Sequence, residues 1–247
     1  MTNDLLDMRF GKGTVQENLA RAVAEGRLEL LPDGNFMSLQ KKGSYSYLQV
    51  KSSRQMECRF LNDFLFRCAY DNTAVPYGCR NCYKVKIVPE NFKGLIALRG
   101  ALEDAPYHSK CGVDFFNQNS RDIYAGFLYL DGLEEARAAY REMRTVVDSH
   151  PDLSRSVQMT IKRGCSHFEA ACGPSDNWTF RDGMAELETH LKARFREASS
   201  ETADYRQRRM ASMLSWLQIA YNLKDDSYLD FTGGKPLHNP TVTYTPE

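Results

Sequence analysis

The middle of the chain alternates between two hydrophobic periods, and this alternation constrains the fold more than any other feature. In YKVKIV at 83–88, apolar side chains alternate with lysines, a period of two that is typical of a strand with one wet face. A helical pattern, the strand YAGFLYL at 124–130, a second helical pattern and the strand SVQMTIK at 156–162 follow. This order predicts crossover connections. We therefore expect an α+β or α/β fold with a central mixed sheet, crossover helices and a helical C-terminal part.

The flanking segments predict further helices and one hairpin. Thr14 and Glu17 have the spacing of a capping box, which predicts a helix that ends at Gly26, and a hairpin turning at 32–34 follows. Two helical stripes mark the last third: Met184, Leu187, Leu191 and Phe195, then Met210, Met213, Leu214, Leu217 and Tyr221. We expect a single domain over 1–247, with a possible subdivision into an N-terminal helix and hairpin (1–57), a cysteine-containing α/β core (58–165) and a helical C-terminal part (166–247).

The overall charge and the N-terminal sequence limit the classes of partner. Acidic and basic side chains number 32 each, so electrostatics give no reason to expect nucleic acid or an anionic membrane as the partner. The first residues, MTNDLLDMRFGKG, lack the pattern of a secretory signal, and no stretch approaches the roughly 20 apolar residues of a membrane span. We therefore expect a cytoplasmic protein without a membrane partner, whose seven cysteines serve metal ligation or reactivity rather than disulfides.

The segment PYGCRNCYKV carries a pair of cysteines, Cys79 and Cys82, on a turn before the first strand of the alternating region. Two thiols at this spacing reach one metal, and the backbone N–H groups of the turn can donate hydrogen bonds to the thiolates. The chain holds no second pair of this kind, so two further ligands have to come from isolated cysteines.

Geometry selects among the isolated cysteines. If residues 58–68 are helical, Cys58 and Cys68 lie about 15 Å apart along the axis, whereas ligands of one metal ion lie within about 4 Å of each other. We expect Cys58, among apolar neighbours, to belong to the core, and Cys68, at the helix end, to be a ligand. Cys111 is followed by a glycine and completes the predicted set of Cys68, Cys79, Cys82 and Cys111.

Single cysteines around one pair favour an iron–sulfur cluster over a zinc ribbon, because a cluster spreads its ligands around a larger inorganic core. The spacing does not distinguish a [4Fe–4S] cluster from a two-iron cluster. We therefore expect a cytoplasmic, cysteine-ligated metalloprotein with a redox or catalytic role. Zinc is the alternative cofactor, and a chain without metal is the third interpretation.

A second concentration of reactive residues lies in KRGCSHFEAACGPSDNW at 162–178. Cys165 follows Lys162 and Arg163 and precedes a predicted helix start, and both influences favour a thiolate. His167 is close enough in sequence to act as a base for it. The segment therefore predicts an activated cysteine, an extra cluster ligand, or an anion-binding pocket formed by Lys162 and Arg163. The alternative is a structural cysteine beside a solvated basic pair.

Two further interpretations come from other functional classes. The first is a zinc-stabilised binding or regulatory module that meets protein or nucleic acid through the basic helix with Arg206, Arg208 and Arg209. Acidic residues nearby favour a solvated helix face at these arginines, so we expect no strong nucleic-acid binding. The second is a thiol enzyme in which Cys165 is the nucleophile and His167 the base.

Overall fold

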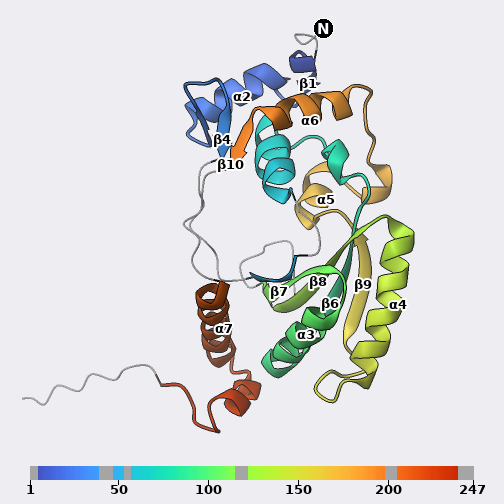
Figure 1. Cartoon of the computed structure of the whole chain (residues 1–247), viewed down its shortest axis with the longest axis vertical. Helices are drawn as coiled ribbons and strands as arrows, with labels where there is room; N and C mark the ends of the chain where they lie inside the picture. The colour runs from blue at the N-terminus through green and yellow to red at the C-terminus, as the bar shows by residue number, and fades with distance from the viewer. Residues whose placement is uncertain (1–4, 39–46, 53–56, 115–121, 198–204, 239–247) are drawn as a thin grey trace, which may run out of the picture.

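The computed structural model of the chain describes residues 5–38, 47–52, 57–114, 122–197 and 205–238. Within these ranges the main sheet has five strands in the order β5-β7-β8-β6-β9, and every neighbouring pair is antiparallel (Figure 1). The strands are β5 (Tyr47–Lys51), β6 (Cys82–Val88), β7 (His108–Val113), β8 (Tyr124–Asp131) and β9 (Gln158–Arg163).

Two crossover helices connect the strands of the main sheet. Helix α3 (Phe92–Asp104) links β6 to β7, and α4 (Leu133–Ser149) links β8 to β9. In each link, one strand of the sheet lies between the two strands that the helix joins, which is the split β-α-β arrangement. The predicted crossover helices and α+β class are thereby confirmed.

The remaining elements lie before, between and after this unit, and a parallel strand pair is found among them. Strand β10 pairs with β4 in parallel, and β3 pairs with β4 as the predicted hairpin. The bounds are β1 (Arg9–Phe10), β2 (Gly13–Thr14), α2 (Val15–Ala24), β3 (Leu28–Leu30), β4 (Phe36–Ser38), η1 (Arg59–Ala69, a π-helix), η2 (Tyr77–Cys79), α5 (Ser166–Cys172), η3 (Ser175–Asn177), α6 (Met184–Ala193), β10 (Phe195–Glu197), α7 (Tyr205–Asn222) and η4 (Asp226–Phe231).

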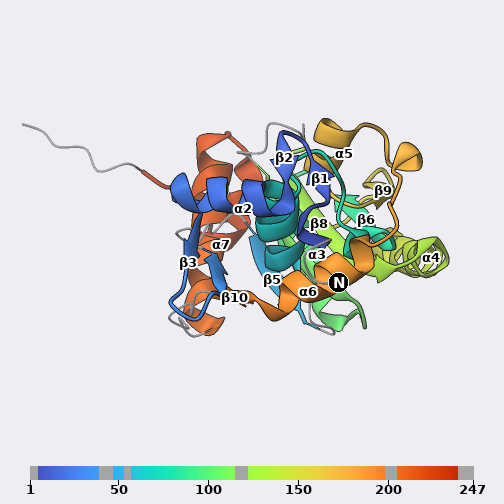
Figure 2. The same ribbon diagram turned by 90° about the horizontal axis from the view of Figure 1, so that it is seen from above.

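Packing crosses the subdivision boundaries that the sequence predicts. The capping box at Thr14 and Glu17 is formed, and α2 buries its apolar face in a core cluster that also contains side chains of η1 and α6. Helices α2 and α6 lie at the same end of the molecule (Figures 1 and 2). The N-terminal helix and hairpin therefore pack with part of the C-terminal third. That the chain is a single domain stays a prediction.

The two faces of the main sheet differ in chemistry. Val85 and Ile87 of β6 are fully buried in the core cluster beneath α3 and α4. Because side chains alternate along a strand, Lys84 and Lys86 lie on the opposite face. The sequence predicts that this face is wet, but Lys84 is only 6% exposed, since its ammonium group contacts Cys165 in the segment before α5.

Helix α7 packs on the β5 edge of the sheet with a face that matches the predicted stripe only in part. The buried side chains are Ser212, Trp216 and Ala220, whereas Met210 and Leu214 of the predicted stripe are 66% and 62% exposed. The other residues of the stripe, Met213, Leu217 and Tyr221, are partly buried against the core cluster. Among the described helices, none has the length and apolarity needed to cross a membrane.

The carboxylate of Asp225 joins η4 to the start of α3 and to β8. Its Oδ2 atom accepts hydrogen bonds from the Phe92 backbone N–H and the Tyr124 hydroxyl, each at 2.7 Å. Its Oδ1 atom accepts from the backbone N–H and the hydroxyl of Ser227 at 3.1 and 2.7 Å. Burial alone raises the pKa of this carboxyl, but the hydrogen bonds outweigh burial and hold the pKa below its ordinary value.

We expect Asp225→Asn to lower the free energy of unfolding by about 1–3 kcal/mol, because an amide offers one acceptor atom where the carboxylate offers two. A carboxyl whose pKa is lowered by folding stabilises the protein above its unfolded pKa of about 3.9, and this effect is lost as the pH falls. The stability difference from wild type should therefore shrink in acid. Urea unfolding at several pH values measures it, with the exposed Asp226→Asn as control. Equal midpoints for the two variants contradict this role.

Candidate functional site

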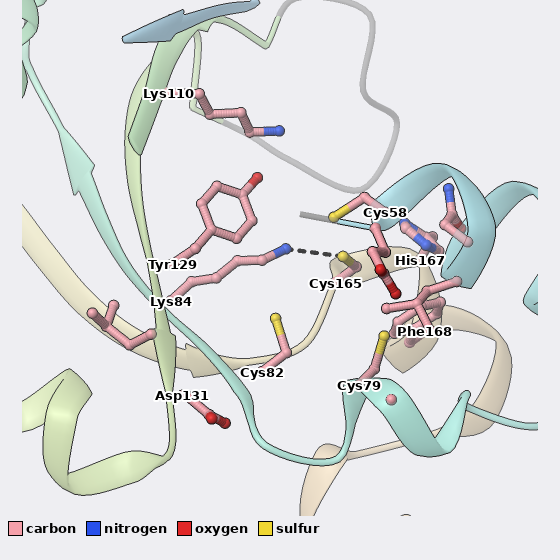
Figure 3. A pocket seen from close by; sticks show the side chains of 15 residues that line it. Cys58, Cys79, Cys82, Lys84, Lys110, Tyr129, Asp131, Cys165, His167 and Phe168 are labelled. Carbon is pink, nitrogen blue, oxygen red and sulfur yellow. Dashed lines mark hydrogen bonds between the residues drawn. The ribbon is translucent and has the colours of Figure 1, made fainter. Parts of the chain in front are cut away.

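Four of the seven cysteines line one cavity of about 410 Å³. They are Cys58, Cys79, Cys82 and Cys165, and their side chains point into the same space (Figure 3). We call this space the cysteine cavity. It lies between the lysine-bearing face of the main sheet, the start of η1, the turn before β6 and the segment that leads into α5. The structure thus brings together thiols from three segments that are distant in sequence.

Local structure explains how the predicted pair reaches the cavity. Cys79 ends η2, where its backbone N–H donates to Pro76 O at 2.9 Å, and Cys82 begins β6. The carbonyl of Cys82 accepts a hydrogen bond from the Gly164 N–H at 2.7 Å, which holds the next residue, Cys165, beside the pair. The pairing of β6 with β9 therefore joins the two cysteine-bearing segments.

Gly164 is required at this junction for two reasons. Its φ of +62° lies in the left-handed region, and a Cβ atom there would lie 2.6 Å from the Trp178 ring. The indole N–H of Trp178 in turn donates to Gly173 O at 2.9 Å, which fixes the ring over the turn. A side chain at residue 164 would push this turn away from the sheet, and Cys165 would move with it.

A buried carboxylate holds the turn before Cys79. Glu188 of α6 accepts hydrogen bonds from the backbone N–H groups of Tyr77 and Gly78 at 2.5 and 2.9 Å and from the Tyr70 hydroxyl at 2.9 Å. Burial raises the pKa of Glu188, and the three hydrogen bonds oppose this rise without cancelling it. A Cβ atom on Gly78 would lie 2.7 Å from Leu61, so glycine permits the close approach of this turn to η1.

Arg163 supports the turn from the other side and does not line the cavity, contrary to the sequence-based prediction. Its Nε and Nη2 atoms donate to Arg80 O at 3.0 and 2.8 Å, and Nη1 donates to Ser175 O at 3.0 Å. Adjacent residues of a strand point to opposite faces, so Lys162 and Arg163 of β9 do not meet in one pocket. Lys162 is on the cavity face, where its Nζ atom donates to the Ser166 hydroxyl at 2.6 Å.

Lys84 is the cation beside Cys165. Its Nζ atom donates to Cys165 Sγ at 2.9 Å and lies 5.0 Å from the centre of the Tyr129 ring (Figure 3). Burial by itself lowers the pKa of this ammonium group, but Cys165, together with Tyr129 and Cys82, outweighs burial and raises it. Lys84 therefore stays charged, and its ammonium group donates directly to the Cys165 sulfur.

The described residues show no hydrogen bond between His167 and Cys165, and the role of His167 as a base stays a prediction. The described residues form no hydrogen bond with its buried Nε2 atom, and its ring packs against Phe66 and Phe168 with centroids 5.6 and 4.5 Å away. Burial lowers the pKa of His167 to about 4, and nearby cations add to this effect. The imidazole is therefore neutral near pH 7, and a base has to lie within hydrogen-bond reach of the proton it takes. Lys84 is within that reach of Cys165, but a charged ammonium group donates hydrogen bonds and cannot take a proton.

The structure separates Cys111 from the pair. Cys111 is fully buried in the core cluster beneath the crossover helices, and burial raises the pKa of its thiol to about 12. It pairs with Gly126 of β8, whereas Cys82 pairs with Asp131. Five residues along a strand correspond to about 16 Å. The predicted ligand Cys111 therefore belongs to the core and does not reach the cysteine cavity.

Cys68 is also placed away from the pair. It is buried in the cluster around α2, and its Sγ atom donates to Asp63 O at 3.3 Å and accepts from Arg27 Nη1 at 3.6 Å. The two cysteines at the ends of η1 thus lie in different places, and the predicted ligand Cys68 does not line the cysteine cavity. Cys58, which was expected in the core, is exposed and lines the cavity.

The four thiols surround the cavity rather than meet at one point. Burial raises the pKa of the Cys79 thiol well above its ordinary value, and Cys82, Cys165 and Cys58 raise it further, so the four sulfurs influence one another. Among the described residues, however, no three His, Cys, Asp or Glu side chains converge closely enough to hold a single metal ion.

The basic helix lies beside the β5 edge of the sheet. Arg206 and Arg208 are exposed near the start of α7, and Arg209 lies 3.7 Å from Glu103 of α3. Arg208 lines a separate cavity together with Tyr47 and other residues of β5. Nucleic-acid binding through these arginines stays a prediction.

We expect Glu188→Gln to lower the free energy of unfolding by about 1–3 kcal/mol, because the amide nitrogen would face a backbone N–H donor at Tyr77 or Gly78. Urea unfolding measures the change, and Glu186→Gln on the exposed side of the same helix is the matched control. If both variants unfold at the wild-type midpoint, Glu188 does not hold the turn before Cys79.

Comparisons with known proteins give no assignment for this site. A scan against protein-family models finds no match, and neither do searches of curated proteins and of solved structures. The function is therefore inferred from the residues of the site itself, which combine four thiols, a buried ammonium group and a buried imidazole nitrogen.

Proposed function

We propose that this chain is an iron–sulfur protein in which the thiolates of Cys58, Cys79, Cys82 and Cys165 hold a [4Fe–4S] cluster in the cysteine cavity. The observation that carries the proposal is the arrangement of four thiols from three segments around one cavity. Four cysteine thiolates are the usual ligand set of such a cluster. The proposal keeps the predicted pair and replaces the predicted Cys68 and Cys111 with Cys58 and Cys165. An extra ligand was one of the alternatives that the sequence left open for Cys165.

The spacing of the thiols supports a cluster rather than a single zinc ion. The four ligands of one zinc ion lie within about 4 Å of one another, and no group of described side chains meets this condition. A cluster places iron and sulfide between the thiolates, so its ligands surround a volume, as they do in the cysteine cavity.

Electron transfer is the role that this ligand set supports best. A cluster with four thiolate ligands has no open iron position for substrate, whereas its charge can change by one electron. Lys84 donates a hydrogen bond to Cys165 Sγ, and a cation at a ligand sulfur favours the more negative, reduced cluster. Cys58 is exposed, so it offers an edge of the site through which electrons can pass.

Removal of single thiols tests the ligand set. Anaerobic reconstitution with iron and sulfide should give a brown protein with broad absorbance near about 400 nm that dithionite bleaches. Cys58→Ser, Cys79→Ser, Cys82→Ser and Cys165→Ser should each lose most of the iron and sulfide, measured by elemental and sulfide analysis. Cys68→Ala and Cys111→Ala are matched controls and should keep both. Loss of the cluster in Cys68→Ala with retention in Cys58→Ser refutes the proposed set.

A thiol enzyme with Cys165 as nucleophile is the second candidate, and the 2.9 Å contact between Lys84 Nζ and Cys165 Sγ favours it. Under this function the ammonium group of Lys84, rather than the imidazole of His167, activates the thiolate.

Alkylation rates distinguish the two functions. In the metal-free protein, iodoacetamide should label Cys165 faster than the buried Cys68 and Cys111, and Lys84→Met should slow this labelling by about tenfold or more. After reconstitution, a cluster ligand is protected from the reagent, whereas a nucleophile stays reactive. Labelling of Cys165 that does not depend on Lys84 contradicts the activated-thiolate function.

A further inference from the structure

A second cavity, of about 170 Å³, adjoins the cysteine cavity on the same face of the sheet. Four lysines line it, and we call it the lysine cavity: Lys84, Lys86, Lys110 and Lys162. The two cavities share the side chains of Lys84, Lys110, Tyr129, Cys165 and His167 as common walls.

The register of the sheet gathers these lysines. Lys84 lies directly opposite Lys162 on β9, and Lys86 and Lys110 lie on the two sides of Phe127 in β8. Like charges directly opposite each other on neighbouring strands destabilise a sheet. A sheet face that gathers four lysines, one of them buried and three half-buried, therefore favours a compensating negative charge.

The carboxylates of the described residues offset only part of this charge. Lys86 pairs with Asp122 at 2.5 Å, and Lys162 lies 3.8 Å from Glu169. Lys84 contacts the thiol of Cys165 rather than a carboxylate. The fourth, Lys110, has no ion pair with a described carboxylate.

Lys110 is held over aromatic rings instead. Its Nζ atom lies 4.5, 5.4 and 5.7 Å from the ring centres of Tyr47, Phe127 and Tyr129. Rings on one side leave the ammonium hydrogens on the other side directed into the cavity. Tyr47 and Asp114, which interact through their side chains, close one end of the same space.

His167 lies between the two cavities. Lys84, Lys110 and Lys162 line the lysine cavity together with it. Its buried Nε2 atom has no hydrogen-bond partner among the described residues, and its ring lines both cavities. A ligand placed there would therefore meet a positive potential and an imidazole nitrogen that is still able to form a hydrogen bond.

We propose that the lysine cavity binds the phosphate group of a small phosphorylated ligand. Lysines act as point charges that can contact phosphate oxygens from several directions, and four of them line this cavity. A volume of about 170 Å³ lies below the usual range of ligand sites and suits one phosphate group rather than a whole substrate. The phosphate site adjoins the proposed cluster site. The lysines can bind phosphate whether or not the cluster is present.

Calorimetric titration with pyrophosphate tests the proposal on both metal-free and reconstituted protein. Binding should be saturable, with a Kd below about 1 mM in low salt, and it should weaken as ionic strength rises. Lys110→Gln should raise the Kd by about tenfold or more, because it removes one charged donor. The exposed Lys12→Gln is the matched control and should bind as the wild type does.

A second measurement on the wild-type chain keeps the test valid if Lys110→Gln does not fold. Pyrophosphate should protect Lys110 and Lys162, but not Lys12, from acetylation by an amine-reactive ester, read by mass spectrometry. Absence of saturable binding, an unchanged Kd in folded Lys110→Gln, or malonate binding as tight as pyrophosphate overturns the phosphate site. Binding of pyrophosphate by a chain that takes up no iron leaves this site standing and refutes the cluster instead.

Discussion

Strand β6 pairs with β8 on one side and β9 on the other, and this antiparallel register fixes the direction of the side chains that reach the site. Because side chains alternate along a strand, burying Val85 and Ile87 beneath the crossover helices sends Cys82 and Lys84 to the other face. A slip by one residue would exchange the two sets and place lysines in the apolar core. The hydrophobic burial that stabilises the sheet thus also places a thiol and an ammonium group in one cavity.

This arrangement buries charge that the fold offsets only in part. Burying an ammonium group or a carboxylate is unfavourable unless hydrogen bonds or opposite charges replace water. Glu188 obtains three donors from the turn before Cys79 and from Tyr70, which directly follows η1, whereas Lys84 has the Cys165 sulfur and the face of Tyr129. An anion that binds the folded chain at this point would stabilise it by mass action. The partial compensation of the buried positive charge by protein groups is therefore more consistent with a binding site than with a purely structural core.

Local sequence patterns predict the main sheet and its crossover helices, because the period of apolar residues is set by neighbours in the chain. Alternation along a strand also predicts that the adjacent side chains of Lys162 and Arg163 point to opposite faces of the sheet. The sequence therefore already argued against placing both side chains in one pocket, and the structure places them on opposite faces. Local sequence patterns do not determine whether Cys58 or Cys68 lines the cavity. Both lie on one helix, and the packing of that helix against α2, a contact between distant segments, determines that Cys58 faces the cavity. The meeting of Cys165 with the cysteine pair likewise depends on strand pairing that no local pattern specifies.

In the proposed arrangement, the shared residue Lys84 couples the two cavities. Its ammonium group, as a donor to a ligand sulfur, stabilises the reduced cluster and so raises the reduction potential. A phosphate bound in the lysine cavity would bring negative charge close to the same ammonium group, and in a partly buried site this charge acts over several ångströms with little screening. Phosphate should therefore lower the potential, and by linkage reduction of the cluster should weaken phosphate binding by the same free energy. If both proposals hold, the contact between Lys84 and Cys165 would connect electron transfer at one cavity to ligand release at the other.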